Sequence, residues 1–197
     1  MGKIFCILGK SGAGKDTVFQ GFLSKHSDDF RPIVEYTTRP KRPKEINGKS
    51  YYFVAESIFS KLREKGKIVE ERVYQTTRGV WRYATVDDGK IDFSIGNYLT
   101  ITTPPALAAL RSRFGDHAVI ALYLEVEDGL RLKRLIHREE KSDAPDYAEL
   151  CRRFLSDERD FSISELGRYR IKYHISNRKL ADCIRCIEKI VNEVLSK

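Results

Sequence analysis

A glycine-rich segment near the start of the chain carries the clearest chemical signal. Gly9, Gly14 and Lys15 have the spacing G-x-x-x-x-G-K, between an apolar run at 3–8 and a helical pattern at 17–25. Glycines let backbone N–H groups curl around phosphate oxygens, and the start of a helix adds partial positive charge. The lysine adds a point charge for the β- and γ-phosphates. The segment predicts a Walker A loop that binds a nucleoside triphosphate, with an ordinary glycine-rich turn as the alternative.

One position of this loop departs from the usual motif. The residue after the lysine is normally a serine or threonine that contacts Mg²⁺, but here it is Asp16, and Thr17 follows. A carboxylate is a stronger hard-oxygen ligand than a hydroxyl, so Asp16 is a candidate metal ligand. Alternatively, Asp16 is a first-turn residue favoured by the helix dipole, and Thr17 serves the phosphates. The candidate nucleotide-binding residues of the loop are Gly9, Ser11, Gly12, Ala13, Gly14, Lys15, Asp16 and Thr17.

A basic segment at 37–45 could bind a second phosphate group. It has four cations among the six residues 39–44, and Pro40 and Pro43 stiffen it. Prolines favour loop geometry, so the arginines do not form a helix face. Arginine makes bidentate contacts with phosphate, which suits a phosphomonoester acceptor. A solvated run of charges is the alternative.

The composition limits the class of protein that holds these residues. A length of 197 residues fits one domain, and 41% hydrophobic with 32% charged residues is ordinary for a globular chain. The 36 basic and 28 acidic residues give a net charge of +8, which indicates anionic partners. No apolar run approaches the roughly 18 residues that indicate a membrane span. We therefore expect a soluble, cytoplasmic protein with no membrane partner.

The four cysteines are too few and too scattered for a disulfide framework, which fits a reducing compartment. Cys183 and Cys186 have the spacing of a metal or redox pair. They lie, however, among apolar residues at 180–194 that have the period of an amphipathic helix. A zinc site would also need a second ligand pair, which the sequence does not offer. We therefore expect the pair to be structural.

The pattern along the chain is that of an α/β protein. Short apolar runs alternate with helical patterns, in the βαβ manner of a parallel sheet. Strands are expected at 3–8, 32–38, 98–102, 118–126 and 169–175, and helices at 17–25, 106–113, 130–138, 147–166 and from 180 onward. Short β-like pieces at 50–54, 67–73 and 80–85, around a short helical pattern, predict a small subdomain inserted in the main fold.

The basic segment and the glycine-rich loop together resemble the guanylate kinase family. The loop is similar to the Gly-x-Ser-Gly-Ala-Gly-Lys loop of these enzymes. The basic segment and the residues after it are similar to the GMP-binding segment of the family. The matching residues there are Thr37, Thr38, Arg39, Pro40, Arg42, Glu45, Gly48, Tyr51, Phe53 and Val54.

The resemblance continues into the residues that would read the base. Val69-Glu70 resembles the acidic position that receives the N1 and N2 hydrogens of guanine. Tyr83-Ala84-Thr85 resembles a segment whose tyrosine holds the GMP phosphate and whose hydroxyl meets the guanine oxygen. A carboxylate only accepts hydrogen bonds, so Glu70 suits guanine, which presents two donors, and repels the acceptor at N1 of adenine. The alternatives are a surface carboxylate and, for Tyr51 and Tyr83, core packing.

Later segments resemble the lid and the adenine site of the family. Arg134, Arg138 and Arg153 are similar to lid arginines that close over the transferring phosphate, although charges on solvated helices are the alternative, most of all for Arg138 beside two glutamates. Ile175-Ser176-Asn177 is similar to a segment close to the adenine of ATP. These clusters account for the basic residues without a nucleic-acid partner.

The resemblance implies a P-loop NTPase fold of three layers around a parallel sheet. The implied parts are a core at 1–34 and 86–197, an acceptor-binding subdomain at about 35–85 and a helical lid at about 134–153. The implied reaction converts ATP and GMP to ADP and GDP with Mg²⁺, in a monomer or homodimer. The implied catalytic residues are Lys15, Arg134, Arg138 and Arg153; the acceptor residues are Arg39, Arg42, Tyr51, Glu70, Tyr83, Thr85 and Thr102; ATP would also meet Asn177. The Mg²⁺ ligand expected from the chemistry of its carboxylate is Asp16.

Several departures from the family bear on the acceptor. An Asp-x-Asp usually ends the strand that here ends in Thr102, so a second acidic contact is lost, and Pro104-Pro105 replaces a Gln-Gly. Glu35 and Tyr36 stand where small hydroxyl residues are common, and the segment between Glu70 and Tyr83 is longer than usual. Asp16 resembles the loop of ribose bisphosphate phosphokinases. A kinase of another small phosphomonoester and a non-catalytic interaction module therefore remain as alternatives.

Overall fold

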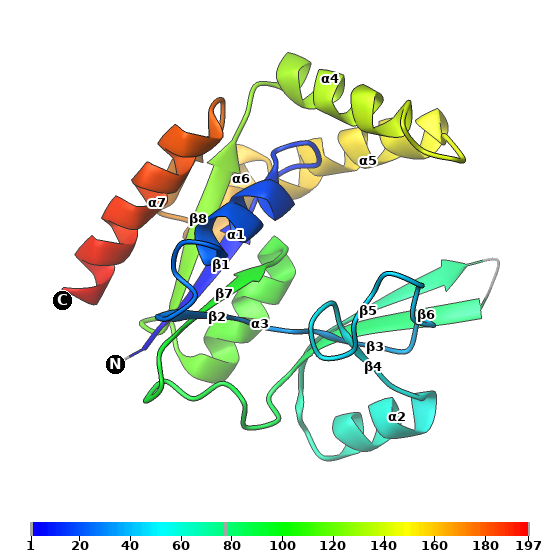
Figure 1. The fold of residues 1–197 in the computed structure, drawn as a ribbon, viewed down its shortest axis with the longest axis vertical. Helices are drawn as coiled ribbons and strands as arrows, with labels where there is room; N and C mark the ends of the chain where they lie inside the picture. Colours follow the sequence, from blue (N-terminus) through cyan, green and yellow to red (C-terminus); the bar gives the residue numbers. More distant parts are fainter. Residues whose placement is uncertain (1, 77–78, 197) are drawn as a thin grey trace.

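The computed structural model describes residues 2–76 and 79–196, and in them the strands form two sheets (Figure 1). The larger sheet has five strands in the order β2-β7-β1-β8-β9, all parallel to their neighbours. Its strands are β1 (Ile4–Leu8), β2 (Phe30–Pro32), β7 (Asn97–Ile101), β8 (Val119–Glu125) and β9 (Tyr173–Ser176). All five residues of β1 are buried, which explains its continuous apolar sequence.

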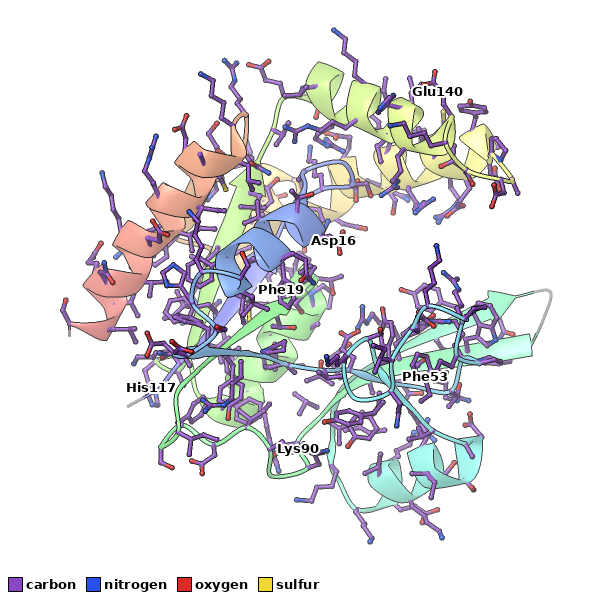
Figure 2. All side chains as sticks on the ribbon, viewed as in Figure 1. Asp16, Phe19, Phe53, Lys90, His117 and Glu140 are labelled. Carbon is purple, nitrogen blue, oxygen red and sulfur yellow. The ribbon has the colours of Figure 1, made fainter. Side chains whose placement is uncertain are left out.

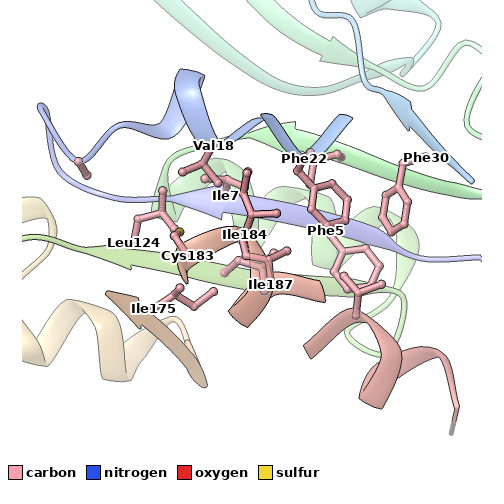
Figure 3. Close-up of a cluster of buried hydrophobic side chains, with 14 of the residues drawn as sticks. Phe5, Ile7, Val18, Phe22, Phe30, Leu124, Ile175, Cys183, Ile184 and Ile187 are labelled. Carbon is pink, nitrogen blue, oxygen red and sulfur yellow. The ribbon is translucent and has the colours of Figure 1, made fainter. Parts of the chain in front are cut away.

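Helices cover both faces of this sheet and make three layers (Figure 1). Phe5 and Ile7 of β1 pack with α1 (Lys15–Leu23) and α7 (Leu180–Leu195), the cluster drawn in Figure 3. The alternate residues of β1 belong to a second cluster, with α3 (Pro104–Phe114) and α6 (Ile163–Arg168) on the opposite face. The period of two along a strand therefore places successive residues of β1 in two different cores.

The smaller sheet lies to one side and has the order β4-β3-β6-β5 (Figure 1). Its strands are β3 (Tyr36–Thr37), β4 (Tyr52–Phe53), β5 (Ile68–Thr76) and β6 (Gly79–Val86). One face packs on α2 (Glu56–Glu64) through a small core that includes Phe59, Ala84 and Val86. In the β5–β6 pairing, Arg72 lies opposite Tyr83 and Glu70 lies opposite Thr85. None of these four residues belongs to the small core, so their side chains are free to form part of a binding site.

A pair of helices, α4 (Asp128–Glu139) and α5 (Tyr147–Asp160), projects beside the loop that precedes α1 (Figure 1). The interval 134–153, expected as a lid, runs from the middle of α4 to the middle of α5. The side chain of Asp146 caps α5 by accepting the N–H of Glu149 at 2.9 Å. Among the described residues, no helix is long and apolar enough to span a membrane.

The strand expected at 32–38 is wrong, because the structure divides it between the two sheets. β2 ends at Pro32 and pairs with β7, whereas β3 begins at Tyr36 and pairs with β4 and β6. Proline has no N–H and cannot continue a ladder in the usual way. The chain makes one more contact with the larger sheet, from the Ile33 N–H to the Leu99 carbonyl at 3.0 Å, before it crosses over.

The helix expected at 147–166 and the strand expected at 169–175 also need correction. α5 ends at Asp160, and Ser162 caps the separate helix α6 through its side chain, which accepts the N–H of Glu165. Arg170 then adopts a positive φ of 49°, so the chain turns and β9 begins only at Tyr173. A single serine is a weak signal for a break, since serines also occur inside helices.

The cysteine pair lies on the inner side of α7, with Cys183 in the core and Cys186 partly buried against it. Cys183 is fully buried in the core beneath α7, and all four cysteines are free thiols. The described residues contain no group of three or more His, Cys, Asp or Glu side chains that could hold a metal ion.

Candidate functional site

The loop between β1 and α1 is shaped by glycines that no other residue could replace without strain. Gly12 and Gly14 have φ of 78° and 84°, in the left-handed region. A Cβ on Gly12 would lie 2.7 Å from the carbonyl oxygen of Arg131, and one on Gly14 would lie 2.7 Å from Nδ2 of Asn177. Conformation and close neighbours therefore both require glycine, and the loop backbone stays open for a ligand.

Lys15 begins α1, and its ammonium group lies inside the loop. Its Nζ donates to the carbonyl oxygens of Gly9 at 2.7 Å and Lys10 at 3.3 Å. Burial lowers the pKa of Lys15 from its ordinary value, and the carboxylates of Asp157 and Asp16 limit the shift. A bound anion would compensate this buried charge, so the loop is prepared for phosphate.

A cavity of about 660 Å³, here called the arginine cavity, opens beside the loop. Lys15 meets three arginines there, Arg134 from α4, Arg138 from α4 and Arg153 from α5. Its other lining residues are Ser11, Gly12, Gly14, Asp16, Thr17, Leu135, Asn177 and Leu180. The structure thus brings together the four residues expected to be catalytic. Four cations around one cavity suit a polyanion such as a triphosphate.

Two expected nucleotide contacts are already engaged with the protein itself. Asn177 is buried, and its Nδ2 donates to the carbonyl oxygen of Ala13 at 2.7 Å. Arg134 donates from Nη2 to the carbonyl oxygen of Asn177 at 3.0 Å. These bonds tie the end of β9 and the helix α4 to the phosphate loop. Asp16 is exposed at the start of α1, between the α4–α5 pair and the smaller sheet in the view of Figure 2.

A charge network joins the loop to α4 and α5, and sequence reasoning missed it. Arg131 is only 1% exposed; its Nε donates to the carbonyl oxygen of Ser11 at 3.0 Å, and its Nη atoms meet Asp157 and Glu158. Asp157 also accepts the Ser11 N–H at 2.6 Å, and Glu158 pairs with Lys10 at 2.7 Å. A signal exists: Arg131 is one helical turn before Arg134 and so shares its face.

A second cavity, of about 550 Å³ and here called the sheet cavity, lies between the loop and the smaller sheet. Gly9, Ser11 and Lys15 line one part of it, and Glu70, Glu71 and Arg72 of β5 line another. Thr102 and the first residues of α3 also belong to it, with residues of α5 and α6 and Tyr169. Because Lys15 lines both cavities, a group in the arginine cavity can meet a group in the sheet cavity at this lysine.

The expected phosphate-binding residues of the smaller sheet form a cluster around Arg39. Arg39 is 4% exposed and bonds both carboxylate oxygens of Glu45, at 2.5 and 3.0 Å, and the Tyr83 hydroxyl at 3.0 Å. Its hydrogen bonds with Glu45 raise the pKa of Arg39 and lower that of the Glu45 carboxyl. The guanidinium carbon of Arg39 lies 5.5 Å from the centroid of the Tyr51 ring, which packs edge-on against Tyr83. The arginine is therefore held rigidly in one orientation.

Arg42 joins this cluster through its backbone and not through its side chain. Its side chain is exposed, and the hydrogen bond that links it to the cluster comes from its backbone N–H to Glu45 at 2.7 Å.

Burial raises the pKa of Tyr51, and the charge of Glu35 adds to that shift, so the hydroxyl stays protonated and can donate at neutral pH.

The expected base-reading residues lie next to one another. Thr85 donates from its hydroxyl to Oε1 of Glu70 at 3.0 Å, and Arg72 donates to the same oxygen at 3.3 Å. Arg72 also pairs with Glu35. Thr102, 8% exposed, faces the same sheet cavity as Glu70. Sequence reasoning missed Arg72, although it stands two residues after Glu70 and hence on the same face of β5.

A family model and several curated relatives indicate one family. A family model described as guanylate kinase matches residues 1–86. A guanylate kinase of Chlamydia felis is 30% identical over 147 residues, 72% of this chain and 68% of that protein. Guanylate kinase 2, chloroplastic/mitochondrial, of rice is 36% identical over 143 residues, which are 71% of this chain but only 48% of the rice protein, so the chain spans about half of that relative.

The fold is also that of a solved structure. A crystal structure of guanylate kinase from Anaplasma phagocytophilum matches 98% of this chain and 85% of that chain with a TM-score of 0.67. The sequence identity of this pair is 19%, so the match establishes the fold alone.

Proposed function

Because the chain belongs to the guanylate kinase family, we propose that it transfers the γ-phosphate of ATP to GMP, giving ADP and GDP. The observation that carries the proposal is the position of Lys15, which lines both the arginine cavity and the sheet cavity. A phosphoryl group transferred between two bound nucleotides must pass a point shared by both sites. Lys15 supplies positive charge at that point.

The arginine cavity is the proposed ATP site. The loop offers backbone N–H groups and the start of α1 to the triphosphate, and the surrounding arginines neutralise charge that develops during transfer. Mg²⁺ would supply further neutralisation between the phosphates. Asp16 is the carboxylate in position to hold it, and phosphate oxygens and waters would complete the ligands, which is how proteins usually bind this ion.

The smaller sheet is the proposed GMP site, with Arg39, Tyr51 and Tyr83 at the phosphate end and Glu70 at the base end. Arg42 would move to the same phosphate from its exposed position. The bound GMP phosphate oxygen attacks the γ-phosphorus, and the bond to the bridging oxygen of ADP breaks. We assign no covalent intermediate, because positioning and charge neutralisation account for the reaction.

The proposed parts of the molecule follow from these two sites. Residues 35–85 would form the acceptor-binding subdomain, and 134–153 would form a lid that carries Arg134, Arg138 and Arg153 toward the transferring phosphate. We propose a monomer or homodimer in the cytoplasm, which the four free thiols support because such thiols persist in a reducing compartment.

An acceptor panel tests the proposal. Purified protein with ATP and Mg²⁺ is offered GMP, dGMP, IMP, AMP, UMP or ribose 1,5-bisphosphate, and ADP formation is measured against a reaction without acceptor. We expect GMP to be the best acceptor. Activity on the sugar phosphate alone would favour a different kinase, and binding of GMP without any turnover would favour a non-catalytic module.

A further inference from the structure

We propose that Arg72 recognises the 6-oxo group of the acceptor purine and, together with Glu70, determines the choice of base. The proposal rests on the function proposed above and names a residue that the family resemblance did not supply. It starts from the arrangement of β5 and β6, where Glu70 pairs with Thr85 and Arg72 pairs with Tyr83. Both Glu70 and Arg72 line the sheet cavity.

The hydroxyl expected to meet the guanine oxygen is already engaged. Thr85 is 4% exposed and donates its single proton to Oε1 of Glu70 at 3.0 Å. A hydroxyl has one donor, so while this bond is made Thr85 does not donate to the carbonyl oxygen at C6 of guanine. A second donor beside Glu70 would let the Thr85–Glu70 bond persist when the base binds.

Arg72 has donors to spare. Nη2 makes both of its contacts, with Glu35 and with Glu70, and the buried Nε has no hydrogen-bond partner among the described residues. An arginine carries five N–H groups in a fixed plane, so two glutamate contacts do not exhaust it. The contacts with Glu35 and Glu70 use Nη2, so the N–H groups of Nη1 remain for a ligand, and the side chain is 28% exposed.

The two side chains together match one purine edge. Guanine presents an acceptor at O6 beside donors at N1 and N2, which correspond to the donor of Arg72 beside the acceptor of Glu70. Adenine presents a donor at N6 beside an acceptor at N1, so both contacts would be repulsive. Arg72 thereby supplies discrimination between guanine and adenine, in place of the carboxylate that Thr102 replaces.

Glu35 has a supporting role in this arrangement. Glu35 lies just before β3 and pairs with Arg72 of β5, so it anchors the guanidinium from a different segment of the chain. Glu35 and Glu70 both pair with the Arg72 guanidinium, so a neutral base enters a site whose arginine already has charged partners.

The test compares two arginines of the same sheet. Arg72→Met is measured beside Arg82→Met, because Arg82 is equally exposed, 26% against 28%, and also pairs with two glutamates, Glu56 and Glu71. The acceptors are GMP and its 6-thio analogue, which keeps N1–H and N2–H₂ but replaces the oxygen by a weak acceptor. For Arg72→Met we expect the KM for GMP to rise about ten- to hundredfold with kcat nearly unchanged.

The analogue separates recognition from mere support. Wild type should prefer GMP to 6-thio-GMP, and Arg72→Met should lose most of that preference, whereas Arg82→Met should keep it with a KM within about twofold of wild type. Equal losses for both acceptors would show that Arg72 only holds Glu70 in place and would overturn the proposal, as would an unchanged KM.

Failure of the kinase function would be visible separately. It would show as a wild type without turnover on GMP, and GMP binding measured by calorimetry would then take the place of KM in the same comparison. Wild type that binds neither nucleotide overturns both proposals. Thermal unfolding of Arg72→Met and Arg82→Met checks that both variants fold.

Discussion

We expect phosphoryl transfer to depend most on the positive charge of Lys15. Lys15→Met should reduce kcat by at least about 10²- to 10³-fold, since it removes positive charge from the point shared by both cavities. The fold should persist, because burial of this ammonium group is unfavourable, as its lowered pKa indicates. Turnover is measured with ATP and GMP, and circular dichroism reports folding. Near wild-type turnover in a folded variant would remove Lys15 from the mechanism.

We predict that Asp16 controls how strongly nucleotide binding depends on metal. If it holds Mg²⁺, its negative charge repels a triphosphate without metal, and Asp16→Asn should bind free ATP more tightly yet need more Mg²⁺ for turnover. ATP affinity with and without Mg²⁺ is measured for both proteins. An unchanged metal dependence would leave Asp16 as a first-turn residue of α1 favoured by the helix dipole.

Arg39 and Arg42 should differ in their effect on the fold. Each alanine variant should raise the KM for GMP about ten- to hundredfold, because each loses charge-assisted bonds to phosphate. Arg39→Ala should also lower the melting temperature, since it leaves the Glu45 carboxylate without its main partner, whereas exposed Arg42 can be removed without that effect. Equal melting temperatures, or altered ATP affinity with unchanged GMP affinity, would contradict the assignment.

We predict that helix α5 competes with a triphosphate for the phosphate loop. Asp157 accepts the Ser11 N–H at 2.6 Å, a group that a phosphate oxygen would need. Asp157→Asn should therefore bind ATP roughly fivefold more tightly, equivalent to about 1 kcal/mol of relieved repulsion.

The control for this helix is Asp143→Asn, which removes the same charge from the exposed connection between α4 and α5. It should leave ATP affinity unchanged. If both variants tighten binding equally, the effect is one of net charge and the contact with Ser11 has no part in it.

The elements that the sequence predicted well are those with a single dominant signal. Strand β1 and helix α1 combine a buried apolar run, glycines and a helical period, so both were found close to their observed bounds. The region 32–38 failed because its β-forming residues are shared by two sheets, and periodicity does not indicate which sheet a residue joins. The end predicted for α5 was wrong because the apolar pattern continues past Asp160, and Ser162 alone marks the start of a new helix.

The candidate site was predictable by residue type, and its internal bonds were not. Lys15, Arg134, Arg138 and Arg153 meet at one cavity as expected. That Thr85 gives its proton to Glu70 and that Arg131 is buried among carboxylates depend on contacts between segments distant in sequence. A pattern in one segment carries no information about such partners.

The core of the whole molecule should respond to alkaline pH through its buried thiols. Burial raises the pKa of Cys6 to about 12 from 9.0, so above pH 9 the unfolded chain releases this proton while the folded chain keeps it. The folded state then binds more protons, and stability falls as pH rises. At pH 10 the loss from Cys6 should be roughly 1.4 kcal/mol.

Urea unfolding at pH 8 and pH 10 measures this loss. Cys6→Ala should lose about 1.4 kcal/mol less between the two values than wild type does. Cys151→Ala is the matched control, because this thiol is exposed, and it should keep the wild-type loss. If Cys6→Ala loses as much unfolding free energy between pH 8 and pH 10 as wild type does, the buried thiol does not contribute to the loss.

The central position of β1 affects how the chain folds during synthesis. This strand is made well before both of its neighbours in the sheet, since Ile4 aligns with Tyr98 of β7 and Val119 of β8. Until those segments leave the ribosome, five consecutive apolar residues have no strand beside them. The nascent chain therefore carries an aggregation-prone strand until β7 and β8 are made, and slow elongation between β1 and β8 would lengthen the period in which a chaperone must protect it.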